Sequence, residues 1–413
     1  MKVLYFYQYF STPAGSTGTR AYEMAKHLVH HGHDVTVVCG DCLTASTGLD
    51  SEMVGGCRSG IVDGIKIIQL DLPYSNKQSL LKRTGIFLRY AFGCVRIAFR
   101  SDANVLFAST TPLTAGIPGI VLKLVRPRLK FVFEVRDLWP ELPRAMGVIK
   151  NPVILSAMSG LEWLSYKCAD GCIGLAPGIA EGICERSNSK KEIEVIPNGC
   201  DLDLFTYGGE LDQDGLREKW GLPRGGIIAA FIGTHGVANG LHAVIDAAIE
   251  LKERGRDDIS LLFVGDGNQK DDLLRLVSEH SLTNCIFRDY VPKQDLGELL
   301  AAVDVGLQIL LNVPAFYRGT SPNKFFDYLS AGLPVINNYP GWLAGVIQEH
   351  RCGSAIPPDD PGAFADALCG YADHRERLTE QGQRSLQLAR EKFDRTSQAN
   401  AWMGFLQKIA DSP

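Results

Sequence analysis

The chain has 413 residues, of which 45% are hydrophobic and 22% are charged, and its formal net charge at pH 7 is -5. This length exceeds what one hydrophobic core usually supports, so we expect two domains. The acidic balance argues against nucleic acid as the main partner, and no apolar run reaches the ~18 residues that a membrane-spanning helix needs. The eleven cysteines are scattered and no signal peptide precedes the first predicted strand, which favours reduced thiols in the cytoplasm.

Strand and helix patterns alternate along the first half of the chain, which is typical of a parallel sheet covered by helices. Residues 40–64, rich in Gly, Ser and Thr, are expected to form a long loop. The predicted strands are residues 3–7, 35–39, 65–70, 105–109, 130–134, 171–175 and 194–196. The predicted helices include residues 20–31, 79–100 and 151–168.

The alternation begins again after a polar connector at residues 207–226. We therefore predict an α/β chain of two Rossmann-like, doubly wound domains, residues 1–206 and 207–394, with a last helix in 395–413 that crosses back onto the first domain. Because such sheets bind ligands beyond the carboxyl ends of their strands, the two domains are expected to face each other across a deep cleft. The strands predicted in the second half are residues 227–232, 260–264, 285–288, 305–310 and 335–336.

The turn after the first predicted strand contains Gly15, Ser16, Thr17 and Gly18 and leads into a helix that begins at Arg20. Small residues in such a turn suit a phosphate group or an acceptor substrate. The spacing is neither the G-x-G-x-x-G pattern of dinucleotide sites nor the Gly-Lys-Ser/Thr pattern of ATPase phosphate loops.

Residues 77–100 combine basic and apolar side chains and contain no acid. A basic amphipathic helix of this kind lies on an anionic membrane, where each basic residue contributes ~1 kcal/mol near the surface. Alternatively, the same apolar residues are buried against a sheet. A helix with one face on the protein core and another on the membrane would combine the two. The basic residues are Lys77, Lys82, Arg83, Arg89, Arg96 and Arg100, and Lys123, Arg126, Arg128 and Lys130 extend the patch.

Charged and aromatic residues follow the strand predicted at 130–134: Arg136, Asp137, Trp139 and Glu141. At the carboxyl end of a strand, an indole that faces a sugar and charged groups that grip its hydroxyls suit a carbohydrate. An interdomain salt bridge with a buried tryptophan is the alternative.

In the second half, Gly233, Thr234, His235 and Gly236 follow an apolar strand and precede a helix. Small residues let the backbone approach a diphosphate, and the helix N-terminus favours its negative charge. The same strand–turn–helix pattern also occurs as plain architecture. Two further strand ends, Gly265 and the pair Tyr290-Val291, are candidates to hold a nucleobase, although these residues alternatively make room or pack.

Ser321, Asn323 and Lys324 precede a helix predicted over residues 325–331, and Asp327 is expected in its first turn. Unpaired N–H groups and the positive end of the helix dipole welcome an anion there. We expect the polar residues to hold a diphosphate and Asp327 to accept hydrogen bonds from a ribose, or else merely to favour the helix dipole.

Two patterns suggest a metal, but neither is convincing. The pair Asp201 and Asp203 resembles a metal-binding D-x-D but follows a turn that leads into the linker. Cys39 and Cys42 have zinc spacing, but no second pair follows at zinc-ribbon distance. We expect no metal and no cofactor.

Together these motifs resemble the retaining family 4 glycosyltransferases, which have the GT-B fold. The resemblance covers nearly the whole chain and is strongest in Pro-Asn-Gly-x-Asp (residues 197–201) and Ala-Gly-x-Pro-Val (331–335). It implies metal-independent transfer of a sugar, with retained configuration, from a nucleotide diphosphate sugar. Residues 7–10 and 136–141 look like a bacterial surface-polysaccharide subfamily (O-antigen or capsule) that moves N-acetyl-fucosamine onto lipid-linked sugars. That implies UDP rather than GDP as the nucleotide. From the basic segment 77–100 we expect a peripheral position on the inner face of the cytoplasmic membrane.

The resemblance also implies residue roles. Asp327 falls on the ribose-binding position, the 233–236 turn on the diphosphate, and Asp137 near the donor sugar; the first-domain residues of the 15–20 turn and Arg136, Trp139 and Glu141 would bind the acceptor. Gly319 stands where the family has a glutamate, and the turn lacks the family's usual Arg and Lys. We therefore expect Lys324, aided by His235, to stabilise the leaving diphosphate. A nucleotide-sugar 2-epimerase of the same fold and a non-catalytic assembly partner remain alternatives.

Overall fold

The computed structural model describes residues 1–75, 77–187, 191–205 and 212–412. The chain forms two compact units: Met1–Asn198 with Arg318–Ser321 and Thr396–Pro413, and Gly199–Tyr317 with Pro322–Arg395. The second unit begins at Gly199, earlier than the boundary expected after residue 206. The reason is a backbone pairing, because Cys200 N–H donates to Phe393 O (2.6 Å) and Arg395 N–H donates to Cys200 O (3.0 Å).

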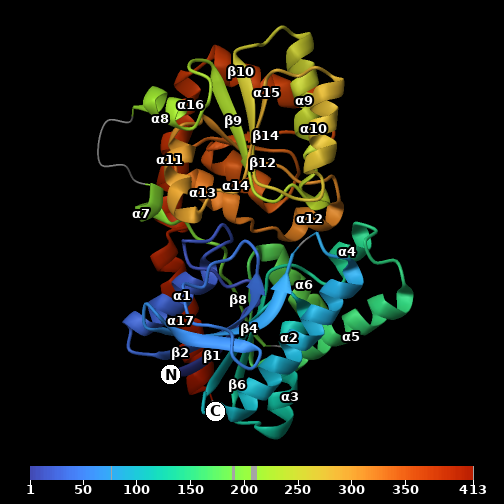
Figure 1. The fold of residues 1–413 in the computed structure, drawn as a ribbon, viewed down its shortest axis with the longest axis vertical. Coiled ribbons are helices and arrows are strands. Elements are labelled where there is room, and N and C mark those ends of the chain that lie inside the picture. The colour runs from blue at the N-terminus through green and yellow to red at the C-terminus, as the bar shows by residue number, and fades with distance from the viewer. Residues whose placement is uncertain (76, 188–190, 206–211, 413) are drawn as a thin grey trace. The chain divides into compact units, whose positions relative to one another are not determined.

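The first unit has an eight-stranded sheet in the order β3-β4-β2-β1-β5-β6-β7-β8 (Figure 1). All neighbouring strands are parallel except β3 and β4. The strands are β1 (Lys2–Phe6), β2 (Asp34–Cys42), β3 (Cys57–Val62), β4 (Ile65–Tyr74), β5 (Val105–Ser109), β6 (Lys130–Val135), β7 (Gly171–Gly174) and β8 (Glu192–Val195).

The prediction that residues 40–64 form one long loop is wrong. Strand β2 continues to Cys42, and β3 pairs with β4 as an antiparallel hairpin in which Val62 lies opposite Ile65. Asp63 (φ 49°) and Gly64 (φ 79°) make the two-residue turn between them. Asp-Gly between two strands is a strong hairpin signal, because both turn residues need positive φ.

Helices cover both faces of this sheet. On one face, α1 (Arg20–His30) and α17 (Arg395–Asp411) contribute to a core that contains Tyr5, Phe107 and Trp402. The other helices of the unit are α2 (Leu80–Arg100), α3 (Ile117–Val125), α4 (Glu141–Ala145), α5 (Pro152–Cys168) and α6 (Pro177–Ser187), with the short η1 (Leu113–Gly116).

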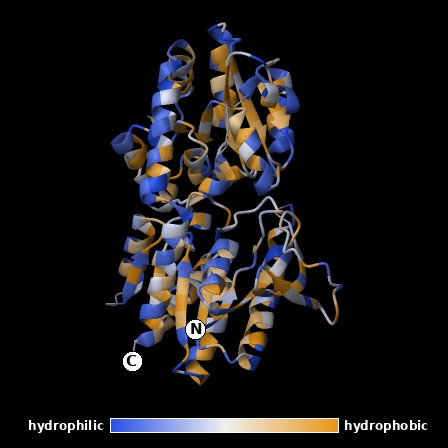
Figure 2. Ribbon diagram, turned by 90° about the vertical axis from the view of Figure 1, so that its left-hand side faces the viewer, coloured by the Kyte–Doolittle hydropathy of each residue, from blue (hydrophilic) through white to orange (hydrophobic). Residues whose placement is uncertain are grey.

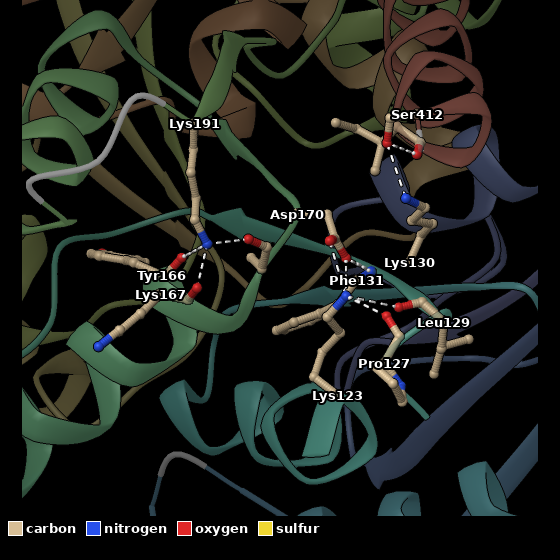
Figure 3. Close-up of polar contacts among 12 residues, drawn as sticks. Lys123, Pro127, Leu129, Lys130, Phe131, Tyr166, Lys167, Asp170, Lys191 and Ser412 are labelled. Atoms are coloured by element: carbon tan, nitrogen blue, oxygen red, sulfur yellow. Dashed lines mark hydrogen bonds and ion pairs between the residues drawn. The ribbon is translucent and has the colours of Figure 1, made fainter. Parts of the chain in front are cut away.

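Polar contacts fasten the ends of α3 and α5 to the sheet (Figure 3). Asp170 accepts a hydrogen bond from Phe131 N–H (2.7 Å) and pairs with Lys123 of α3 (2.9 Å). Lys191 donates to the last carbonyl groups of α5, including Tyr166 O at 2.9 Å. Lys130 donates to Ser412 Oγ (3.1 Å). Lys123 and Lys130 are thus engaged within the unit and do not extend the exposed basic patch as predicted.

The second unit has a six-stranded sheet in the order β11-β10-β9-β12-β13-β14, in which all neighbours are parallel. Helices α9 (His242–Glu253) and α15 (Pro361–Asp373) pack on the core that contains Phe231 and Phe263. The strands are β9 (Ile227–Ile232), β10 (Ile259–Val264), β11 (Cys285–Arg288), β12 (Val305–Gln308), β13 (Val335–Asn337) and β14 (Gly353–Ala355). The remaining elements are α7 (Leu202–Phe205), α8 (Gln213–Lys219), η2 (Val237–Asn239), α10 (Lys270–Glu279), η3 (Lys293–Asp295), α11 (Leu296–Ala301), α12 (Pro314–Gly319), α13 (Asn323–Ser330), α14 (Trp342–His350) and α16 (Glu376–Lys392).

Figure 2 shows that the central strands of both sheets are hydrophobic along their length, whereas most helices alternate between hydrophobic and hydrophilic residues. Parallel strands covered by helices on both faces have this continuous apolar pattern. The prediction of two Rossmann-like α/β domains is confirmed. None of the helices in the described ranges combines the length and the hydropathy needed to span a bilayer.

Candidate functional site

The turns that follow β9 and β10 pack backbone against backbone. Gly265 has φ +138°, and a Cβ atom there would lie 2.0 Å from Gly233 O. A Cβ on Gly267 would lie 2.3 Å from His235 O, so a side chain at either glycine would push the turns apart. Gly233 N–H donates to Val264 O (2.9 Å). The predicted diphosphate turn and one predicted base-binding residue therefore lie together.

A third strand end joins this edge. The Tyr290 hydroxyl donates to Asp266 O (2.7 Å), which ties the segment after β11 to the turn after β10. Val291 follows it and is half-buried. The carboxyl ends of parallel strands meet at one edge of a sheet, and all three base candidates lie at that edge.

Lys324 lies beside the diphosphate turn. A Cβ on Gly233 would lie 3.4 Å from Lys324 Cε, and Lys324 Nζ donates to Asn239 Oδ1 (2.9 Å). Asn239 in turn donates to Thr234 O (2.7 Å). Lys324 Nζ also lies 4.0 Å from the centre of the Phe231 ring, and it has no acidic partner among the residues that the structure describes. Burial lowers the pKa of Lys324 to about 7.

His235 is fully buried among three aromatic rings, at centroid distances of 6.1 Å from Phe231, 6.3 Å from Phe263 and 6.1 Å from Phe287. Burial, aided by the nearby positive charge of Lys270, lowers the pKa of His235 to about 4. The imidazole is therefore neutral at pH 7 in the free protein, and its help in stabilising a diphosphate stays a prediction. Neither ring nitrogen has a hydrogen-bond partner within the described part of the chain.

The helix that carries Lys324 begins earlier than predicted. Helix α13 starts at Asn323, so Asp327 lies in its second turn and the first turn has no acid. Pro322 precedes Asn323 with extended backbone angles and marks the start of the helix. The Asn323 Oδ1 atom is buried without a hydrogen-bond partner in the described residues.

Asp327 belongs to a buried cluster of four charges. Lys293 forms an ion pair with Asp327 and lies 3.4 Å from Asp201 Oδ2, and Arg395 Nε lies 2.7 Å from Asp201 Oδ1. Burial raises the pKa of Asp327, although Lys293 opposes the shift. Burial also disfavours the charge of Asp201, but Arg395 and Lys293 lower its pKa to about 2. Asp201, the first residue of the D-x-D pattern, is thus engaged in ion pairs. Binding of a ribose by Asp327 stays a prediction.

Ser321 belongs to the first unit, whereas Asn323 and Lys324 belong to the second. The Ser321 hydroxyl accepts a hydrogen bond from Asn198 N–H (3.1 Å). Asn198 thus holds Ser321 in place, and a role of Ser321 at the diphosphate stays a prediction.

The turn predicted to bind the acceptor has a core residue at its end. Arg20 is fully buried and donates from Nε to Glu134 Oε2 (3.0 Å), from Nη1 to Pro197 O (2.6 Å) and from Nη2 to Ile196 O (2.9 Å). We correct its assignment, because a guanidinium occupied in this way supports the sheet and has no exposed face for a ligand.

In the rest of that turn, Gly15 is buried and the next three residues are half-buried. A Cβ on Gly15 would lie 2.2 Å from Ser11 Oγ, and Ser16 Oγ donates to Thr44 O (3.2 Å). Thr17 Oγ1 is buried without a hydrogen-bond partner in the described residues, and Gly18 is half-buried.

Residues 136–141 follow β6 as predicted. Arg136 N–H donates to Thr110 Oγ1 (2.8 Å), and its guanidinium lies 5.2 Å from the Tyr7 ring centre. Burial raises the pKa of Asp137, and Arg136 opposes the shift. The Trp139 Nε1 atom is buried and lacks a hydrogen-bond partner among the residues described. Glu141 Oε2 lies 3.7 Å from Arg186.

Sequence reasoning missed Gln8 and Lys293. Gln8 is 1% exposed, and both atoms of its amide lack hydrogen-bond partners in the described residues. A polar residue at the end of the apolar strand β1 was a signal for Gln8. Nothing in the sequence signalled that Lys293 would meet Asp327, because the two are 34 positions apart.

Two family models match the chain. Residues 15–199 match the glycosyl transferase 4-like domain, and residues 226–374 match the glycosyl transferases group 1 domain. Between them the two models account for most of the chain.

Curated relatives agree with these matches. A 2-deoxystreptamine glucosyltransferase of Streptomyces kanamyceticus is 30% identical over 165 residues, which are 40% of this chain and 41% of that protein. A D-inositol 3-phosphate glycosyltransferase of Corynebacterium urealyticum is 28% identical over 191 residues, 42% of its length. The chain thus spans about two fifths of these relatives. A colanic acid biosynthesis glycosyl transferase of Escherichia coli K12 is 22% identical, with 80% of this chain and 82% of that protein covered.

Solved structures share the fold. Sucrose-phosphate synthase from Thermosynechococcus elongatus superposes with a TM-score of 0.77 at 16% identity, covering 99% of this chain and 98% of that one. Anabaena HepE, solved in complex with UDP and glucose, superposes with a TM-score of 0.70 at 16% identity, covering 98% and 99%. These neighbours have the GT-B fold. The chain therefore combines a glycosyl transferase 4-like domain with a glycosyl transferases group 1 domain on that fold.

Proposed function

We propose that this glycosyltransferase moves a sugar, with retained anomeric configuration, from a nucleotide diphosphate sugar onto a lipid-linked sugar acceptor. The observation that carries the donor half is Lys324, a half-buried cation that has no acidic partner in the described residues and lies beside the Gly233 turn. A diphosphate would supply the missing negative charge. Anabaena HepE was solved in complex with UDP and glucose, which supports a UDP-sugar as the donor.

The chemistry assigned to Lys324 is stabilisation of the leaving group. As the sugar departs, negative charge grows on the diphosphate, and fixed donors there lower the barrier more than they favour the bound substrate. The backbone N–H groups of Thr234 and of Asn323, at the start of α13, would add to this effect. Retention without a protein nucleophile implies front-face attack, in which a leaving phosphate oxygen takes the acceptor's proton. Asp137 is proposed to orient the donor sugar. Because Lys324 supplies the charge, the reaction would need no metal ion.

The base and the ribose of the donor are assigned to the other residues predicted for the second unit. The base would lie against Gly265, Tyr290 and Val291, and the ribose against Asp327, whose Oδ2 makes no hydrogen bond within the described ranges. Gly319 removes the carboxylate that the family usually has near the sugar, so sugar recognition here depends on other groups.

The acceptor is assigned to the first unit, through the 15–18 turn, Arg136, Trp139 and Glu141. Helix α2 supports a lipid-linked acceptor, because its outward side exposes apolar residues next to basic ones: Leu81 is 87% and Phe92 70% exposed. We propose that α2 rests on the anionic inner face of the cytoplasmic membrane. The name of the Escherichia coli relative supports a role in surface polysaccharide assembly, as for O-antigen or capsule.

A transfer assay with UDP-sugars and membrane lipid extracts tests the proposal. Lys324→Ala should lower kcat by ~10²-fold or more while changing donor affinity less, since its charge matters most in the transition state. Lys252→Ala, which removes an exposed lysine of α9, is the matched control and should leave the rate unchanged. Activity should persist in EDTA.

Two outcomes contradict the proposal. An epimerised UDP-sugar formed from donor alone would identify a 2-epimerase. Tight UDP binding without nucleotide release, with every lipid extract supplied, would identify a non-catalytic assembly partner.

A further inference from the structure

Arg83 in the first turn of α2 is a cation without an anionic partner among the residues that the structure describes. Its guanidinium lies 5.6 Å from the centre of the Tyr74 ring, and its Nε atom is buried without a hydrogen-bond partner in the described residues. No carboxylate in the described ranges pairs with it. A half-buried guanidinium normally has a carboxylate, phosphate or carbonyl partner, because burial without one costs free energy.

A row of tyrosines runs from Arg83 to Arg136. Ring centres are 5.1 Å apart between Tyr74 and Tyr9 and 6.1 Å apart between Tyr9 and Tyr7, and Arg136 lies 5.2 Å from Tyr7. All five residues belong to the first unit. Tyr7 and Tyr9 follow directly after β1, and Tyr74 ends β4, so the row follows the carboxyl edge of the sheet that bears the acceptor candidates.

The rings are held rigidly. Tyr74 stacks on Phe87 of α2 at a centroid distance of 5.6 Å, and it and Tyr7 are only 5% and 6% exposed. Tyr9 and the two arginines are half-buried and present the accessible part of the row. Tyrosine faces and hydroxyls suit sugar rings, and a guanidinium held over a ring suits a phosphate bidentately.

The Arg83 end of the row adjoins Leu80, which lies three positions before Arg83 on the same side of α2 and is 46% exposed. A ligand whose anionic group meets Arg83 would therefore place its hydrocarbon chain against Leu80 and its opposite end toward Arg136. An amphiphile with a diphosphate between lipid and sugar has this order of groups.

We propose that Arg83 binds the diphosphate of the lipid-linked acceptor and that Tyr9 contacts its first sugar, with Arg136 at the reacting end. This inference rests on the proposed function and deepens it by assigning the acceptor site to named residues. Arg83 contacts substrate but takes no part in bond making.

Farnesyl diphosphate is the probe, and the Lys324→Ala chain is the background, because it lacks the cation of the donor site. Isothermal titration calorimetry should detect binding, and a further Arg83→Ala change should weaken it by about tenfold or more, as expected for a lost charge-assisted hydrogen bond. Arg83→Lys should lose part of the affinity, because a lysine keeps the charge but not the planar fork. Farnesol and inorganic pyrophosphate should each bind more weakly than the intact probe.

The control is Arg89→Ala, which removes an exposed arginine from the same helix. It should leave farnesyl diphosphate binding unchanged, and unaltered thermal melts should show that both variants fold. Equal loss for Arg83→Ala and Arg89→Ala would overturn the proposal in favour of general electrostatic attraction to α2. The two proposals can fail separately. If farnesyl diphosphate binding depends on Arg83 but no sugar transfer is found, the binding site is supported and only the proposed function is refuted.

Discussion

Lys324 gives the donor site a titratable cation. Burial lowers the pKa of Lys324 to about 7 from its ordinary 10.5, so the side chain is charged below pH 7 and neutral above it. A diphosphate binds the charged form. UDP affinity should therefore be constant just below pH 7 and should fall by about tenfold per pH unit above it, until the pKa of the complex is reached. Titration calorimetry between pH 7 and pH 9 would show this slope and proton uptake on binding.

Lys324→Arg is the control for that slope, because a guanidinium stays charged throughout this range. UDP affinity that does not change with pH in the wild-type chain would refute the role of Lys324. The stability of the free protein changes with pH in the opposite direction. Between pH 7 and 10.5 the unfolded chain binds the proton that folded Lys324 has lost, so this residue makes the free energy of unfolding rise with pH.

Asp327 offers a second residue-scale prediction. If its free oxygen accepts a hydrogen bond from the ribose, Asp327→Asn should weaken UDP binding by about tenfold, since a charged acceptor becomes a neutral one. The same change should leave 2′,3′-dideoxy-UDP unaffected, because that ligand lacks the hydroxyls. Equal weakening of both ligands would instead trace the effect to the ion pair with Lys293.

Local chemistry was predictable at single residues, and long-range partners were not. Glycines at 233 and 265 follow apolar strands, so their turns could be located from sequence. Arg20 could not be assigned correctly, because its partner Glu134 is 114 positions away. Its polar surroundings in the sequence suggested a ligand, whereas folding supplies a buried carboxylate and two carbonyl groups.

At the scale of elements, α2 has two apolar faces. Ile86, Tyr90 and Cys94 are buried in the first unit, while Leu88 and Phe92 face outward at 53% and 70% exposure. Both sequence interpretations of this segment, burial and membrane contact, therefore have residues to support them. Hydropathy alone could not divide the residues between the two faces.

The outward face should bind membranes without stabilising the fold. Leu88→Ser together with Phe92→Ser should leave the melting temperature unchanged and lower binding to vesicles with about 30% phosphatidylglycerol by tenfold or more, because less apolar area enters the bilayer. Raised salt should weaken wild-type binding, since basic residues contribute. Leu274→Ser on α10, 41% exposed in the second unit, is the matched control. Undiminished vesicle binding by the double variant would rule out this face.

The missed strand β3 and the misplaced start of α13 show where the prediction of elements fails. The alternating pattern located the central strands, because parallel buried strands are continuous apolar runs. It missed β3, whose exposed and half-buried residues carry no such run, although Asp63-Gly64 marked the hairpin. It also placed the start of α13 after Lys324, because polar residues at a helix start resemble a loop.

Each of the two units has a hydrophobic core, and the last helix contributes to a core of the first unit. Trp402 of α17 is fully buried, with ring centres 4.9 Å from Phe107 and 5.8 Å from Tyr5. Trp402→Ala should destabilise the first unit by ~3–5 kcal/mol through the cavity it leaves. Phe263→Ala in the core of the second unit should have a comparable effect there, because Phe263 stacks on Phe287 at 4.6 Å.

Differential scanning calorimetry with UDP can assign these effects to the two units. UDP binds the native state, so it should raise only the transition of the second unit, which carries Lys324 and the 233–236 turn. Trp402→Ala should lower the other transition and leave the UDP-dependent shift intact, whereas Phe263→Ala should lower the transition that UDP raises. If UDP instead raised the transition that Trp402→Ala lowers, the donor site would belong with the first unit and its assignment to Lys324 would fail.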